Sequence, residues 1–131
     1  MSEPEALALT EVSAPFWEAA AQDKLVLQRC DDCAAFVWYP RALCPRCGAT
    51  SLTWTPAAGT GTVYALSVHH KAPRPELEAL TPYAIVLVDL DEGVRMMARA
   101  AVDDAQSVAV GQRMRWRPDP DGGRAFLFEP A

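Results

Sequence analysis

The residues best suited to chemistry are the four cysteines, which form two Cys-x-x-Cys pairs with ten residues between them: Cys30, Cys33, Cys44 and Cys47. A two-residue gap lets the chain turn back in a tight knuckle, so that both sulfurs of a pair face one centre. Two such knuckles present four thiolates in a tetrahedron, the usual ligand set of a structural Zn²⁺ ion. The pattern predicts one structural zinc ion with no open coordination position, a site that stabilises the fold and performs no reaction itself.

Other uses of the cysteines stay open on the sequence alone. A rubredoxin-like iron site has the same four ligands. Two disulfides would fit a secreted chain, and a thioredoxin-like redox centre would need one pair at the head of a helix in a βαβ unit, which nothing here predicts. The zinc knuckle itself requires a positive φ after its second cysteine, which Gly48 supplies without strain and Ala34 supplies less well.

Composition limits the class of protein. The chain has 131 residues, of which 50% are hydrophobic and 22% charged, as in a soluble globular protein with one domain or a small metal module joined to a compact barrel. The start, MSEPEALALTEVS, is acidic where a secretory signal is basic, and no apolar run could span a bilayer. We therefore expect a cytoplasmic protein without membrane contact, in which clustered cysteines favour metal over disulfides. A net charge of −5 disfavours binding to nucleic acid.

The first part of the chain predicts a short helix and a ribbon of strands. Residues 13–22 read as a helix with Ser13 as its cap and Pro15 in its first turn. Strands are predicted at 24–30, 36–40 and 51–55, leading into and out of the knuckles. A glycine-rich junction then divides the chain, so the predicted domains are an N-terminal helical segment, a zinc ribbon and an OB-fold barrel, at residues 1–23, 24–56 and 57–131.

The last part of the chain contains five strand-like runs, at 62–70, 83–90, 94–102, 112–118 and 124–130. Turns are expected at 91–93 and 118–123. Five short strands in so few residues favour a small closed barrel of the OB type, since an open sheet would leave exposed edges. The fold class is therefore mainly β.

The face assignments of these strands follow from alternation. The first run places Tyr64, Leu66 and Val68 on one face, and residues 83–90 are apolar enough for a strand buried on both faces. In 94–102 we expect an inward set and an outward set: Val94, Met96, Ala98 and Ala100 inward, Arg95, Met97 and Arg99 outward. In 112–118, Met114 and Trp116 oppose three arginines, Arg113, Arg115 and Arg117. These arginines read either as a solvated strand face or as a basic stripe for single-stranded nucleic acid.

Two further groups of residues are candidates for binding. The short predicted helix cannot stand alone, so Phe16 and Trp17 must bury against the chain itself or against a partner. Together with Trp38 and Tyr39 they form the predicted partner interface. The long polar connection after residue 68 carries the predicted substrate-binding residues, His69, His70, Lys71 and Arg74, whose cations could meet phosphates. No nucleophile elbow, phosphate loop or paired carboxylates are recognisable, so no catalytic residue is predicted.

Six segments, spanning Pro15 to about Pro130, together resemble the family called domain of unknown function thirty-five: PFWEAA, LVLQRCDDC, YPRALCPRCG, GTGTVYALSVHH, PYAIVLVDLDEG and VGQRMRWR. The most specific are CPRCG and GTGTVY. One residue of the first knuckle, Ala34, departs from the family pattern, because members of the family usually have glycine at this position. The resemblance implies a rubredoxin-like zinc ribbon followed by an OB fold associated with acyl-CoA.

The resemblance also implies a function. Members of this family accompany thiolase-superfamily enzymes, among them acyl-CoA thiolases, acetyltransferases and aldolases that cleave steroid side-chain CoA thioesters by retro-aldol chemistry. It implies a non-catalytic subunit that stabilises a thiolase-like dimer in an α2β2 assembly and helps to shape an acyl-CoA site formed mainly by the partner. The alternatives from other classes are a nucleic-acid-binding OB fold, an electron carrier and an enzyme that acts on CoA thioesters alone.

Overall fold

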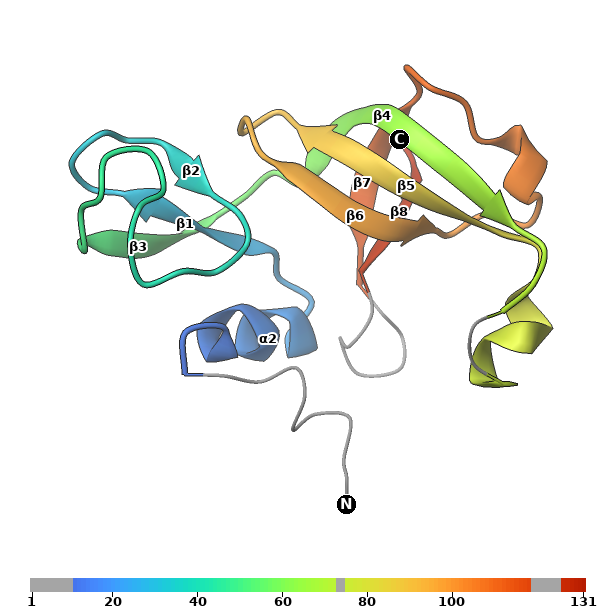
Figure 1. The fold of residues 1–131 in the computed structure, drawn as a ribbon, viewed down its shortest axis with the longest axis horizontal. Helices are drawn as coiled ribbons and strands as arrows, with labels where there is room; N and C mark the ends of the chain where they lie inside the picture. Colours follow the sequence, from blue (N-terminus) through green and yellow to red (C-terminus); the bar gives the residue numbers. More distant parts are fainter. Residues whose placement is uncertain (1–10, 73–74, 119–125) are drawn as a thin grey trace. The chain divides into compact units, whose positions relative to one another are not determined.

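The computed structural model describes residues 11–72, 75–118 and 126–131, which form two compact units. One unit consists mainly of the residues up to Ala58, and the other runs from Gly59 onward. The first unit holds helix α2 and a three-stranded antiparallel sheet in the order β2-β1-β3 (Figure 1). The elements are α2 (Ala14–Ala21), β1 (Val26–Cys30), β2 (Phe36–Val37) and β3 (Leu52–Pro56). The predicted helix and three ribbon strands are thus present, with the second strand shorter than expected.

Helix α2 begins differently from the prediction. Ser13 has helical backbone angles, φ −92° and ψ −11°, and its side chain makes no capping hydrogen bond. A side-chain cap needs an extended N-cap residue, so the prediction of a serine cap was wrong. The carbonyl of Ser13 instead accepts from the backbone N–H groups of Phe16 and Trp17 at 3.0 and 3.3 Å. Proline in the first turn lacks only an N–H that would have no helical partner, as expected.

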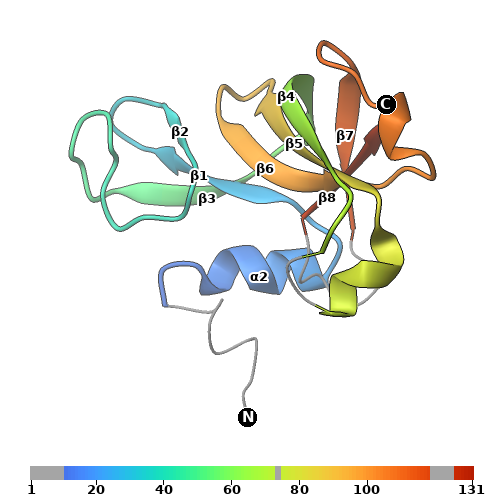
Figure 2. The same ribbon diagram turned by 45° about the vertical axis from the view of Figure 1, so that its right-hand side comes forward.

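The second unit is a closed five-stranded barrel in the order β4-β5-β6-β8-β7, the OB fold that the sequence predicts (Figures 1 and 2). All neighbours pair antiparallel except β6 with β8. Two short 3₁₀ helices, η1 and η2, lie between strands. The bounds are β4 (Thr60–His69), η1 (Pro75–Leu80), β5 (Tyr83–Leu90), β6 (Arg95–Ala100), η2 (Ala105–Ser107), β7 (Arg113–Arg117) and β8 (Leu127–Pro130).

The barrel core is built from one side of each strand. Among the described residues, seven of its side chains are at most 1% exposed: Val63, Ala84, Val86, Val88, Met96, Met114 and Phe128. The alternation predicted for β6 and β7 is confirmed, because their burial patterns place the arginines outward and the methionines at 96 and 114 inward. Where β4 passes β5, Gly61 is required, since a Cβ at this position would overlap the carbonyl oxygen of Asp89.

A β-bulge in β4 overturns one face assignment. The register with β5 shifts between Val63 and Ala65. The extra residue reverses the alternation at that point, so Val63 is buried and Tyr64 is 53% exposed. The prediction that Tyr64 lies on one face with Leu66 and Val68 was therefore wrong.

Strand β5 is also not buried on both faces as predicted. Its inward residues are buried, namely Ala84, Val86, Val88 and Leu90, but Ile85 and Leu87 on the other side are only half-buried. A closed barrel has one interior, so the outward apolar residues of this strand remain accessible. The connection after β4 is likewise not an irregular loop throughout, because η1 occupies its second half. The predicted turn at 118–123 and the start of the last strand at 124–125 lie outside the described residues, apart from Pro118.

Candidate metal centre

The two cysteine knuckles repeat one backbone pattern. In the first, the N–H of Ala34 donates to the carbonyl of Cys30 at 2.9 Å; in the second, the N–H of Gly48 donates to the carbonyl of Cys44 at 2.8 Å. The residue after each second cysteine has a left-handed backbone, with φ 66° at Ala34 and 81° at Gly48. Alanine therefore adopts a conformation that glycine would take without strain, and the first knuckle forms despite the strain.

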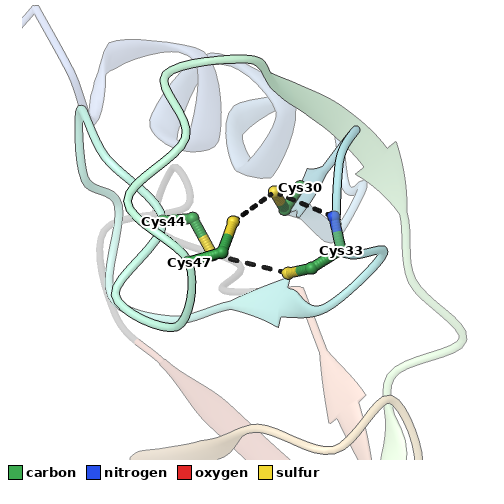
Figure 3. Close-up of side chains that lie close together, drawn as sticks. All are labelled: Cys30, Cys33, Cys44 and Cys47. Atoms are coloured by element: carbon green, nitrogen blue, oxygen red, sulfur yellow. Dashed lines mark hydrogen bonds between the residues drawn. The ribbon is translucent and has the colours of Figure 1, made fainter.

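The four sulfurs face one centre (Figure 3). All four Sγ atoms lie within 4.8 Å of one another, with 3.5 Å between Cys30 and Cys47 and 3.7 Å between Cys33 and Cys44. A tetrahedron with Zn–S bonds of about 2.3 Å has sulfur–sulfur edges of about 3.8 Å, close to these distances. A disulfide requires about 2.05 Å, and all four cysteines are free, so two disulfides do not fit.

Each knuckle contributes one buried and one exposed thiol. Cys30 and Cys44 are 1% and 2% exposed and pack with Val37. The partly buried side chains of Ala49 and Leu52 pack against this cluster. The second cysteine of each pair is exposed. This small cluster is the apolar core around the sulfurs, and the amide of Cys33 donates to the Cys30 sulfur at 3.4 Å.

Electrostatics explain why the cluster needs a cation. Backbone N–H groups, that of Cys47 first and then that of Arg46, together with neighbouring thiols, lower the pKa of Cys44 to about 7 against the opposing effect of burial. At Cys47 the N–H of Ala49 lowers the pKa, but the Cys30 sulfur, burial and the other thiols together raise it to about 12. The Cys44 thiol therefore ionises readily, whereas the Cys47 thiol resists ionisation because adjacent thiolates repel one another. A divalent cation removes that repulsion.

The four thiolates thus fit one Zn²⁺ ion, which they would hold in a closed tetrahedron. Such an ion contributes folding free energy, and with no position left for water or substrate it supplies no reaction.

A buried glutamine supports the segment that joins the knuckles, and the sequence reasoning missed it. Gln28 is 6% exposed, its Nε2 donates to the carbonyl of Arg41 at 2.8 Å, and its Oε1 accepts from the N–H of Arg41 at 2.8 Å. The signal was available: Gln28 shares strand parity with Cys30, so a polar side chain occupies an inward position of β1.

The predicted interface residues form an aromatic cluster within the first unit. The Phe16 ring lies 5.2 Å from that of Trp17 and 5.0 Å from that of Trp38, and the rings of Trp38 and Tyr39 are 5.2 Å apart. Phe16 is 1% exposed and Tyr39 is 47% exposed. Phe16 therefore attaches the helix to its own unit, while Tyr39 is the member of the cluster that solvent reaches most.

The predicted substrate-binding residues are only partly described. His69, at the end of β4, is half-buried and stacks on Tyr83, with ring centroids 5.2 Å apart and an interplanar angle of 13°. His70 and Lys71 are exposed, and Arg74 lies outside the described residues. No hydrogen bond or ion pair found within the described residues links either histidine to a carboxylate, so the geometry adds no catalytic role.

The arginines of β7 are neutralised by nearby carboxylates. Arg113 bonds Asp91 with distances of 3.0 and 2.8 Å, and Arg115 bonds Glu129 at 2.8 Å. The guanidinium of Arg117 lies 3.9 Å from the same Glu129 carboxylate. This row is an ion-paired strand face, which weakens the interpretation as a nucleic-acid stripe. Within the described part of the chain, no helix has the length and apolar character of a membrane span.

A four-cysteine ribbon followed by a closed five-stranded barrel defines a zinc-ribbon and OB-fold protein. Two family models match it: "ChsH2, rubredoxin-like zinc ribbon domain" over residues 17–53, and "ChsH2, C-terminal OB-fold domain" over residues 54–117. The chain belongs to the DUF35 family, the domain of unknown function thirty-five. It is also similar to a "DUF35 domain-containing scaffold protein" of Methanocaldococcus jannaschii, with 30% identity over 81% of each chain.

Other relatives carry enzyme names. A "Probable enoyl-CoA hydratase alpha subunit" of Thermomonospora curvata is 39% identical over 73% of this chain, and a "3-oxo-4,17-pregnadiene-20-carboxyl-CoA hydratase alpha subunit" of Mycobacterium tuberculosis is 30% identical over 76%. The chain spans only 30% and 31% of the length of these two relatives. A solved structure, "Ltp2-ChsH2(DUF35) aldolase", has 33% identity and a TM-score of 0.80, covering 94% of this chain and 97% of that chain.

Proposed function

We propose that this protein is a non-catalytic, zinc-binding accessory subunit of a thiolase-superfamily acyl-CoA enzyme. The observation that carries the proposal is the closed four-thiolate centre: its ligands are all protein sulfurs, so this site stabilises a fold and leaves no position for a substrate. Similarity over nearly the whole chain to the DUF35 chain of an aldolase supports the same view. The partner then supplies the catalytic residues, and the two chains together form the enzyme in the cytoplasm.

The reaction we propose is retro-aldol cleavage of a steroid side-chain CoA thioester. In this reaction the bond between the α and β carbons of a β-hydroxyacyl-CoA breaks, giving a ketone and a shorter acyl-CoA. The name of the similar aldolase supports the reaction type, and the pregnadiene-carboxyl-CoA name of one relative supports the steroid substrate.

Two roles fall to this chain in the complex. Its ribbon docks on the thiolase-like dimer in an α2β2 assembly through the aromatic cluster, with Tyr39 as the most accessible anchor and Trp38 beside it. Phe16, which contacts Trp17, holds the helix in place. Its connection after β4 approaches the acyl-CoA site, where Lys71 and Arg74 donate charge-assisted hydrogen bonds to CoA phosphates, next to His69 and His70.

A second candidate is supported by the hydratase names. In that case the complex adds water to an enoyl-CoA, and this chain corresponds to about a third of an alpha subunit. A subunit of an acyl-CoA thiolase or acetyltransferase is the remaining alternative from the family resemblance. The three reactions use different substrates and give different products, so assays with each substrate in turn tell them apart.

The test is co-expression with a thiolase-superfamily protein from the same genome. We expect the two chains to copurify, and to convert a steroid β-hydroxyacyl-CoA to ketone and shorter acyl-CoA only when both are present. Conversion of the corresponding enoyl-CoA and water to the β-hydroxyacyl-CoA, without cleavage of the carbon–carbon bond, would instead establish the second candidate. Turnover by this chain alone, or failure to copurify with any thiolase-like protein, would refute the accessory role.

The phosphate contact has its own test. Arg74→Ala should raise the dissociation constant of the complex for acyl-CoA several-fold, whereas an exchange of an arginine on the ion-paired β7 face, Arg115→Ala, should leave it unchanged. Unchanged affinity in Arg74→Ala and in Lys71→Ala would remove this assignment and leave the accessory role standing.

A further inference from the structure

The outer face of β4, β5 and β6 carries an apolar hollow. It has a volume of about 240 Å³ and is lined by Ala65, Leu66, Ser67, Ile85, Leu87 and Met97. The strand register explains it: Leu87 lies between Ala65 on β4 and Met97 on β6, and Ile85 lies opposite Ser67. Small side chains on β4 beside larger ones on β5 and β6 leave a depression along the sheet. These three strands lie side by side on one side of the barrel, with β7 and β8 behind them in Figure 1.

Two large apolar side chains at this hollow, here called the β5 groove, are well exposed. Met97 is 62% exposed, and Tyr64 at one end is 53% exposed. The Tyr64 ring lies 3.5 Å from the guanidinium carbon of Arg95, which in turn bonds the carboxylate of Asp89 at 2.6 and 3.2 Å. Since contiguous exposed apolar surface on a folded domain usually marks a binding face, the β5 groove needs an explanation.

The opposite side of the barrel offers a direct contrast. Its outward positions on β7 are arginines held by Asp91 and Glu129, a solvated and charge-balanced face. The two outer faces of the barrel therefore differ in kind. The lining of the β5 groove is itself uncharged and includes methionine, as in the core of a protein interface, and the charged residues of its face lie beside it.

The charge at the edge of the groove indicates what kind of surface covers it. Arg99 lies opposite Ile85 on the same outer face and is half-buried. Four other arginines of the barrel have a carboxylate within 4.0 Å, whereas no ion pair to Arg99 is found among the described residues. A half-buried guanidinium beside an apolar groove is complementary to a carboxylate that flanks an apolar side chain.

We propose that the β5 groove is the barrel's docking site for the partner subunit, and that the partner inserts an apolar side chain between Leu87 and Met97 while an adjacent carboxylate pairs with Arg99. This inference rests on the proposed function and adds a second contact surface to the aromatic cluster of the ribbon. A second copy of this chain is a poorer occupant. The described carboxylate on this face, Asp89, is already held by Arg95, so a two-fold pairing of the same face gives Arg99 no acceptor.

The experiment measures the affinity of this chain for the copurifying thiolase-superfamily protein by titration calorimetry. Met97→Glu places a charge in the groove, and Arg99→Ala removes the guanidinium at its edge; both residues lie on the outer face, so neither change disturbs the core. Val110→Glu is the matched control, because Val110 is 65% exposed and apolar like Met97 but does not line the groove. We expect Met97→Glu to weaken binding at least a hundredfold, Arg99→Ala about tenfold and Val110→Glu less than twofold.

The outcomes separate this inference from the proposed function. If the unaltered chain does not bind the thiolase-like protein, the proposed function fails and this inference fails with it. If it binds and the two groove variants bind equally well, the accessory role stands and the groove is not its docking site. Equal weakening by Val110→Glu also overturns the assignment. Sedimentation of the isolated chain completes the test: a dimer that Met97→Glu dissociates would identify the groove as a self-association face and overturn the proposal.

Discussion

The ribbon buries few apolar side chains around its cysteines, chiefly Val37 with Cys30 and Cys44, whereas the barrel encloses a continuous core that includes Val86, Met96 and Phe128. A core as small as that of the ribbon does not offset the conformational entropy of ordering its chain, so its fold depends on the metal–sulfur bonds. The barrel depends on apolar burial. In one short chain, two units are thus stabilised by different kinds of interaction, and we expect that each can be disrupted without the other.

Metal removal should have the largest effect, and only on the ribbon. A strong chelator, or Cys44→Ser, removes metal–ligand free energy that reaches about 10 kcal/mol in small zinc modules. Hydrogen exchange should then lose protection at the amides of Cys30 and Cys44, which donate to the carbonyls of Ala35 and Ala49 at 2.9 Å. The amide of Val86 in the barrel is the internal control and should stay protected. Retained protection in the metal-free ribbon would contradict the comparison.

Truncation of a side chain in the barrel core should destabilise the barrel and leave the ribbon intact. Met96→Ala leaves a cavity in the barrel and should lower its free energy of unfolding by about 2–5 kcal/mol. Its neighbour Met97 is 62% exposed, so Met97→Ala should cost less than about 0.5 kcal/mol in the isolated chain. Denaturant unfolding followed by a barrel signal measures both. Similar losses for the two methionines would show that the assigned inner and outer faces of β6 are incorrect.

The two knuckles provide a smaller and matched effect. Ala34→Gly removes a left-handed alanine, and should stabilise the metal-bound ribbon by about 1 kcal/mol. Gly48→Ala introduces the same strain, with open space around the new Cβ, and should destabilise the ribbon by a similar amount. Competition with a chromophoric zinc chelator measures each. Changes of the same sign in both variants would be incompatible with this explanation.

The weakest effect is the pH dependence of the ion-paired side of the barrel. Hydrogen bonds from Arg113 first, and then from Thr60, lower the pKa of Asp91 from 3.8 to about 2. Because the pKa in the folded state is below the ordinary value, the pair contributes stability above about pH 4 and loses it as the pH falls through about 2. Both side chains are about half exposed, at 51% and 50%, so the contribution is small. Carboxyl NMR titration should show the Asp91 pKa returning toward 3.8 in Arg113→Ala; an unchanged pKa would refute the assigned cause.

Much of this architecture could be predicted because its signals are local. Cysteine spacing fixes the knuckles, and alternation fixes the faces of β6 and β7, as Met96 and Met114 confirm. Apart from the cap at Ser13, which is a local feature, the errors came from features that depend on other parts of the chain. The bulge that turns Tyr64 outward is set by pairing with β5, and the accessible side of β5 follows from closure of the barrel.

In the candidate site too, the local features could be predicted from the sequence and the contacts between distant segments could not. Spacing alone grouped the four cysteines, and the structure brings their sulfurs together. The clamp by Gln28 on the backbone of Arg41 is a contact between segments distant in sequence, and so is the β5 groove, whose lining comes from three strands. The domain boundaries and the roles of the loop after β4 and of the aromatic cluster stay predictions.

The most direct test of the central claim, that four thiolates saturate one structural zinc ion, is native mass spectrometry of the purified chain beside its denatured mass. We predict a native mass that exceeds the reduced apo chain by one zinc ion, less the protons displaced from the thiols, and a denatured mass with all four cysteines reduced. A folded ribbon without metal, with iron in place of zinc, or with a denatured mass lowered by two disulfides would contradict it.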